Sequence, residues 1–167
     1  HGKFKIPDNK NSRRTHCFFA AGSGITPIFS MIKFLLEEEP MSNVVLLYSN
    51  KKESDIIFYH ELIQIEEKYS GQIKIFFTLT GKRKSSLFSF LRPPLPKWKG
   101  WQGRIETSMI KKLLEEIKGF NKDKEFYLCG PGNFIQRIEQ HLLHLQIDFH
   151  NIHKEYFNIK TEKNETE

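Results

Sequence analysis

The stretch HCFFAAGSGITP, residues 16–27, places a short apolar run directly before a turn of small residues and the start of an amphipathic helix. Such a turn presents free backbone N–H groups and the positive end of a helix dipole, for which phosphate is the natural ligand. Gly22 and Gly24 let the backbone approach a ligand closely, and Pro27 suits the first helical position. A glycine turn also occurs only to make a tight connection, so this motif alone leaves both interpretations open.

A second apolar run, EFYLCGPG at residues 125–132, also ends in a glycine turn before a periodic segment. Two strands that each end in such a turn indicate two adjacent strand ends in one parallel sheet. Ligands of open α/β sheets bind at the carboxyl ends of the strands, where such turns meet. We therefore expect the turns after Ala21 and after Cys129 to lie side by side and to share a single dinucleotide.

Apolar runs alternate with amphipathic segments along the chain, and this alternation predicts βαβ units. The expected fold class is α/β, with a doubly wound parallel sheet of about five strands and helices on both faces. The expected strands are residues 17–20, 44–48, 73–79, 126–129 and 152–157. A helix is predicted from Ser108 to Lys118 with Thr107 as its cap. Residues 81–104 are predicted to be a surface excursion with at most a short helix at 86–91, in which Trp98 and Trp101 pack under the loop or stack on a ligand.

The bulk properties narrow the classes of partner. The 167 residues carry a formal net charge of +6, which suits nucleic acid, an acidic protein or a phosphorylated small molecule. No nucleic-acid motif accompanies the charge, and no apolar run approaches the roughly 20 residues that span a bilayer. Cys17 and Cys129 lie far apart and the histidines show no ligand spacing, so we expect no metal site, surface histidines and a cytoplasmic protein.

Six segments in register resemble the pyridine-nucleotide-binding domain of the ferredoxin–NADP reductase superfamily, and in particular the electron-transfer reductases of oxygenases, of the phenylacetyl-CoA epoxidase reductase type. The segments are residues 21–27, 47–50, 77–80, 103–105, 127–131 and 153–157. The resemblance implies an NAD(P)-binding domain at residues 16–157. Residues 1–15 would be a linker or the remnant of a preceding flavin-binding barrel, and residues 158–167 a polar, frayed tail.

The resemblance also implies a role for individual residues. The turn of Gly22, Ser23, Gly24 and Ile25, followed by Pro27, would hold the dinucleotide pyrophosphate, with Thr26 beside the nicotinamide ribose. Cys129 would approach the nicotinamide where hydride leaves, and Gly130 and Pro131 would shape that gap. Glu155 and Phe157 would border the flavin and the nicotinamide slot. Thr80, Lys82 and Arg83 would receive the adenosine ribose and any 2′-phosphate.

Several of these residues have a purely structural alternative. Thr26 could only cap the helix, Cys129 could be a small buried hydrophobe, and the run from Lys82 to Lys84 could be a solvated loop. No acidic residue stands at the expected end of the second strand, in the segment SNKK at residues 49–52. NAD-preferring folds often hold the ribose 2′-OH there with a carboxylate, so the sequence favours NADPH over NADH.

The leading hypothesis is the NAD(P)H-binding part of a flavin-dependent oxidoreductase. It would present the nicotinamide for hydride transfer to FAD on a flavin domain of the same polypeptide, with onward transfer to an oxygenase or ferredoxin. A plant-type [2Fe–2S] cluster needs a C-x4-C-x2-C set, so it could lie only on a separate or removed domain. We expect the chain to be inactive without its flavin domain. The alternative is a non-catalytic nucleotide-binding or protein-docking domain of the same fold.

Overall fold

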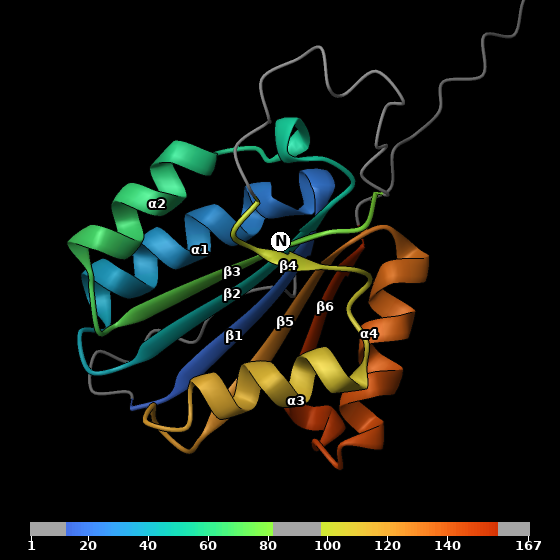
Figure 1. The fold of residues 1–167 in the computed structure, drawn as a ribbon. Helices are drawn as coiled ribbons and strands as arrows, with labels where there is room; N and C mark the ends of the chain where they lie inside the picture. The colour runs from blue at the N-terminus through green and yellow to red at the C-terminus, as the bar shows by residue number, and fades with distance from the viewer. Residues whose placement is uncertain (1–12, 82–97, 157–167) are drawn as a thin grey trace, which may run out of the picture.

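The computed structural model describes residues 13–81 and 98–156, which form an α/β domain around one sheet (Figure 1). All of its strand pairs are parallel, and the spatial order is β4-β3-β2-β1-β5-β6. The strands are β1 (Thr15–Ala21), β2 (Asn43–Asn50), β3 (Ile73–Leu79), β4 (Trp101–Gln102), β5 (Lys124–Gly130) and β6 (Ile152–Tyr156). The expected doubly wound parallel sheet is confirmed.

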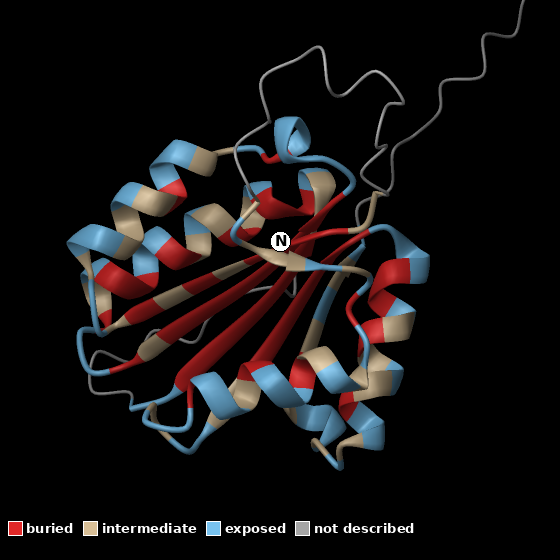
Figure 2. Cartoon of the chain, in the orientation of Figure 1, coloured by how far each residue is buried: buried red, intermediate tan, exposed pale blue. Residues whose placement is uncertain are grey.

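Helices cover both faces of the sheet (Figure 1). The helices are α1 (Ile25–Glu38), α2 (Tyr59–Lys68), α3 (Thr107–Glu116) and α4 (Gly132–His144). Successive strand residues point to opposite faces, so β1 serves two cores. Phe18 belongs to the core under α1 and α2, whereas Phe19 belongs to the core under α3 and α4. Burial on both faces explains why the central strands are continuous apolar runs (Figure 2).

The sheet has a sixth strand that the sequence analysis missed. Strand β4 lies within the segment predicted to be irregular, and it pairs with β3 through Thr78↔Trp101 and Leu79↔Gln102. Trp98 packs against the core under α1 and α2, and its indole Nε1 donates to the Trp101 carbonyl at 2.9 Å. The Trp101 ring lies 4.9 Å from that of Phe76. These contacts favour packing over ligand stacking for both tryptophans. The short helix predicted at 86–91 lies outside the described residues.

Two predicted helix starts are also corrected. Helix α1 begins at Ile25, so Pro27 is its third residue rather than its first. The position still costs no hydrogen bond, because the first four N–H groups of a helix lack intrahelical partners. Helix α3 begins at Thr107 itself, with Glu106 before it. Instead of capping the helix, the Thr107 Oγ1 hydroxyl lies 2.9 Å from Nδ1 of His141 on α4.

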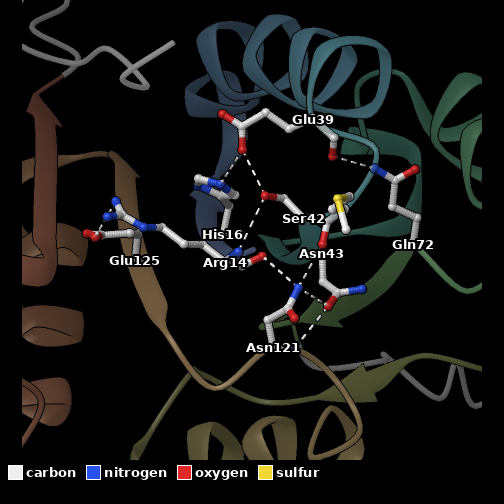
Figure 3. A network of polar contacts seen from close by, with 9 residues as sticks. Arg14, His16, Glu39, Ser42, Asn43, Gln72, Asn121 and Glu125 are labelled. Carbon is white, nitrogen blue, oxygen red and sulfur yellow. Dashed lines mark hydrogen bonds and ion pairs between the residues drawn. The ribbon is translucent and has the colours of Figure 1, made fainter. Parts of the chain in front are cut away.

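A polar network joins the amino-terminal ends of the strands, on the edge opposite the glycine turns (Figure 3). His16 is 2% exposed, and its Nε2 lies 3.3 Å from Oε2 of Glu39. The Ser42 hydroxyl donates to the same carboxylate oxygen at 2.8 Å. The expectation of surface histidines is therefore wrong for His16, because this residue belongs to a strand that is buried on both faces.

No helix among residues 13–81 and 98–156 has both the length and the apolar character needed to cross a lipid bilayer. The prediction of a linker or domain remnant at residues 1–15 falls largely outside the described residues, although β1 already begins at Thr15. The predicted tail at 158–167 also lies outside them. These two boundaries stay predictions.

Candidate functional site

The two glycine turns lie side by side at the carboxyl edge of the sheet. Strand β1 pairs directly with β5, and Ala20 is the register partner of Cys129. The helix that follows β1 packs on one face of the sheet and the helix that follows β5 packs on the other (Figure 1). The connections from these two neighbouring strands therefore leave toward opposite faces of the sheet. An open α/β sheet binds its ligands in the crevice at such a switch point.

Gly24 is the contact that joins the two turns. A Cβ at this position would lie 2.4 Å from the carbonyl oxygen of Cys129, so the start of α1 packs directly on the last peptides of β5. Gly22 is a glycine for a different reason. It has a φ of +53°, and a Cβ there would meet nothing within 4 Å. The backbone at Gly22 thus adopts the left-handed conformation that favours glycine, and the space above it stays open.

A buried tyrosine holds the first turn in place. The Tyr48 hydroxyl on β2 donates to the Gly22 carbonyl at 2.8 Å, and burial raises the pKa of this phenol. Ser23 and Thr26 are exposed beside the turn, whereas Ile25 is buried beneath it. The backbone at the start of α1 is therefore fixed from below. The N–H of Ile25 is paired within the turn, because it donates back to the carbonyls of Gly22 and Ser23. The positive end of the α1 dipole favours an anion at this place.

A cleft of about 560 Å³ opens at this edge and receives residues from both turns. Gly22 and Ser23 line it from the first turn, Pro131 from the second, and Thr80 from the end of β3. The predicted site residues Gly24, Thr26, Cys129 and Glu155 do not line it. Gly130 is tightly placed as well, because a Cβ there would approach the Phe134 ring to 3.0 Å and the Ala21 Cβ to 3.1 Å.

The thiol of Cys129 is buried at the junction of the turns. Burial, with a smaller contribution from Glu155, raises its pKa to about 11, and burial raises the pKa of Cys17 to about 12. Glu155 is the register partner of Cys129 on β6, so its carboxylate lies at the same edge. A thiol with so high a pKa stays protonated at neutral pH, which leaves Cys129 a steric rather than a nucleophilic part in the site.

Three predicted site residues, Lys82, Arg83 and Phe157, lie outside the described residues. The cleft also contains side chains to which the sequence analysis gave no role, among them Lys51, Asp55, Arg104, Asn133 and Arg137. Asp55 bears on the choice between NADH and NADPH, which stays a prediction. It lies on the 3-10 turn Glu53–Asp55 shortly after β2, and this turn returns a carboxylate to the cleft that the sequence of β2 itself lacks.

Residues 18–140 match the family model described as the oxidoreductase NAD-binding domain. The chain belongs to this family. It is 28% identical over 135 residues to NADH-cytochrome b5 reductase 2 of Neurospora crassa, covering 80% of the chain and 35% of that protein. It is 27% identical over 157 residues to a component of the 1,2-phenylacetyl-CoA epoxidase of Escherichia coli, covering 94% of the chain and 41% of that component. The predicted superfamily is thereby confirmed.

Solved structures share the fold of this NAD-binding domain. The CS-b5R domains of human Ncb5or in the NAD+ form superpose with a TM-score of 0.70 and 28% identity, covering 92% of the chain and 39% of that protein. The chain spans between a third and a half of the length of these relatives. The first glycine turn and the open cleft lie at the strand ends where open α/β sheets bind their ligands.

Proposed function

We propose that this domain binds a reduced pyridine nucleotide and presents its nicotinamide for hydride transfer to FAD held by another domain. Electrons would then pass to an acceptor protein such as an oxygenase, a ferredoxin or a cytochrome. The observation that carries the proposal is the contact of Gly24 with the Cys129 carbonyl, because it merges two strand-end turns into one crevice. The cofactors supply the redox chemistry, and the protein supplies binding and orientation.

The proposed roles of single residues are those that the family resemblance implies. The turn of residues 22–25 would hold the pyrophosphate, and Pro27 would fix the helix start behind it. Thr26 would meet the nicotinamide ribose. Cys129 would approach the nicotinamide ring, and Gly130 and Pro131 would shape the gap that the ring enters. Glu155 and Phe157 would border the flavin, and Thr80, Lys82 and Arg83 the adenosine ribose.

We further infer that the nucleotide is NADH rather than NADPH. Asp55 and Lys51 line the cleft together with Thr80, so the end of the cleft proposed for the adenosine ribose carries both a carboxylate and an ammonium group. A carboxylate accepts hydrogen bonds from a ribose 2′-OH, but it repels the dianionic 2′-phosphate of NADPH. The named relatives among the cytochrome b5 reductases carry NADH in their names, which supports the same choice.

The nucleotide preference is tested by titrating the protein with NADH and with NADPH. We expect the wild type to bind NADH more tightly than NADPH. The Asp55→Asn variant should lower the ratio of the Kd for NADPH to the Kd for NADH by about tenfold. Asp123→Asn, at an exposed site between α3 and β5, is the matched control and should leave the ratio unchanged. Equal Kd values in the wild type would contradict the NADH preference, and no binding of either nucleotide would contradict the proposed function.

Hydride transfer is tested separately, by mixing the protein that includes its flavin domain with NADH under anaerobic conditions. We expect the flavin absorbance to bleach. Nucleotide binding without bleaching would instead support the alternative of a non-catalytic nucleotide-binding domain. A Cys129→Leu variant should slow the bleaching more than Cys129→Ser, because the proposed role of Cys129 depends on its size and not on a thiolate.

A further inference from the structure

A second hollow of about 330 Å³ opens beside the nucleotide cleft, and we name it the α3–α4 hollow. Its lining residues are Arg104, Glu106, Thr107, Ser108, Arg137 and His141. Arg104 and Arg137 line both the hollow and the cleft, so these two cations form the boundary between them. Neither arginine forms an ion pair with a carboxylate in the part of the chain that the structure describes.

Two polar atoms on this boundary are buried without a hydrogen-bond partner. They are Nε of Arg137 and Nε2 of His141. Buried polar atoms in proteins are nearly always paired, so two unpaired nitrogens on one wall point to partners that a ligand supplies. The guanidinium of Arg137 carries a proton on every nitrogen and can only donate, so the missing partner of its Nε is a hydrogen-bond acceptor. Nε2 of His141 donates or accepts according to the tautomer of the ring.

The neighbouring groups add further donors to the same place. Nδ1 of His141 lies 2.9 Å from the Thr107 hydroxyl, and this contact fixes the ring while leaving Nε2 for another partner. Helix α3 begins here, and Ile110 is the first residue whose N–H bonds back, to the carbonyl of Glu106. The earlier N–H groups lack intrahelical partners and stand at the positive end of the helix. The opposing charge in the hollow is Glu106, which is exposed.

We propose that Arg104, Arg137 and His141 form a binding site for a phosphoryl group at the α3–α4 end of the nucleotide cleft. A phosphoryl group offers several acceptor oxygens and a charge that two guanidinium forks can share, which a single carboxylate does not. The group is either a phosphate of the bound nucleotide, in which case the inference rests on the proposed function, or a separate phosphate anion. Both sources present the same chemistry to these side chains.

The test measures the affinities of the complete protein for inorganic phosphate and for NADH by calorimetry. The variants are Arg104→Gln and Arg137→Gln, and the matched control is Lys111→Gln, which removes one positive charge from an exposed site on α3 outside the hollow. We expect each arginine variant to weaken binding of at least one ligand by about tenfold or more, and the control to bind as the wild type does. Arg137→Lys should weaken binding less than Arg137→Gln, because it keeps the charge and loses the fork.

The two sources give different results. If a phosphate of the nucleotide occupies the site, NADH displaces inorganic phosphate and the arginine variants weaken NADH binding. If the site holds a separate anion, inorganic phosphate binds to the NADH-saturated protein and only its own affinity falls in the variants. Unchanged affinities for both ligands in both folded arginine variants would overturn the proposal. A wild type that binds phosphate but not NADH would contradict the proposed function and leave the phosphoryl site supported.

Discussion

At the scale of single residues, we expect His16 to make the stability of the domain depend on pH. Burial lowers the pKa of its imidazole, and Arg14 acts in the same direction, against the smaller opposing effects of Glu39 and Glu125. The unfolded chain therefore takes up this proton at a higher pH than the folded chain does. The free energy of unfolding should fall as the pH drops below about 6.5, the ordinary pKa of histidine.

The measurement is Tm between about pH 7.5 and pH 5 for the wild type and for His16→Gln. We expect the variant to show a shallower fall in Tm over this range, because it lacks the titrating group. His60→Gln, at an exposed position on α2, should follow the wild-type slope. Parallel curves for the wild type and His16→Gln would show that His16 does not couple folding to pH.

The two cysteines lead to a prediction about reactivity. With pKa values raised to about 11 for Cys129 and about 12 for Cys17, and with both side chains fully buried, neither thiol forms an appreciable amount of thiolate near pH 8. We expect iodoacetamide to leave both unmodified in the folded protein and to modify both after denaturation, as read by mass spectrometry. Rapid labelling of Cys129 in the native protein would contradict its assignment as a steric element of the site.

At the scale of the elements, Gly24 couples the start of α1 to the end of β5. An alanine Cβ would lie 2.4 Å from the Cys129 carbonyl, so Gly24→Ala must push the two elements apart. We expect a loss of about 1–3 kcal/mol in the free energy of unfolding and weaker NADH binding. Gly119→Ala, whose Cβ would meet nothing within 4 Å, is the control. Denaturant unfolding and NADH titration check both effects, and equal stability of the two variants would contradict the coupling.

The sequence predicted the elements whose own residues form a recognisable apolar pattern. Burial on both faces gives β1, β2 and β5 continuous apolar runs, and the glycines after β1 and at the end of β5 predicted where the cleft would lie. Strand β4 has only two residues and no periodicity, and it exists because Trp101 and Gln102 pair with β3. A strand that forms only because it pairs with a neighbouring strand has no local sequence pattern that predicts it.

The missed site residues have a similar physical explanation. Arg137 lies on α4 beside Ile138, and its spacing from the second glycine turn carries no recognised motif. It reaches the cleft only because α4 packs against the sheet near α3. Asp55 comes back to the cleft through a 3-10 turn, which the polar sequence after β2 does not specify. Side chains brought in by tertiary packing are therefore the part of the site that single-sequence reasoning does not find.

At the scale of the whole molecule, the second glycine turn lies next to the exposed end of β6. Tyr156 is 48% exposed at the end of β6, and its register partner is Gly130 in the second glycine turn. A single exposed aromatic side chain is common on protein surfaces, so the proposed flavin domain rests on the family resemblance and not on Tyr156. The described residues on this side end at Tyr156, directly before the predicted flavin-bordering residue Phe157.

We therefore expect the 167-residue chain, shown to be folded by circular dichroism, to bind NADH and yet to reduce no ferricyanide when flavin is absent. Hydride transfer requires the nicotinamide and the flavin in near-contact geometry, roughly 3–3.5 Å between reacting atoms, and this domain would supply only the nicotinamide side. The same chain joined to its flavin domain should turn over. Adding free FAD to the isolated chain is the matched control and should restore little activity, because nothing would hold the flavin against Cys129. NADH-dependent turnover by the flavin-free chain would contradict the proposal that this domain binds the nicotinamide and another domain holds the flavin.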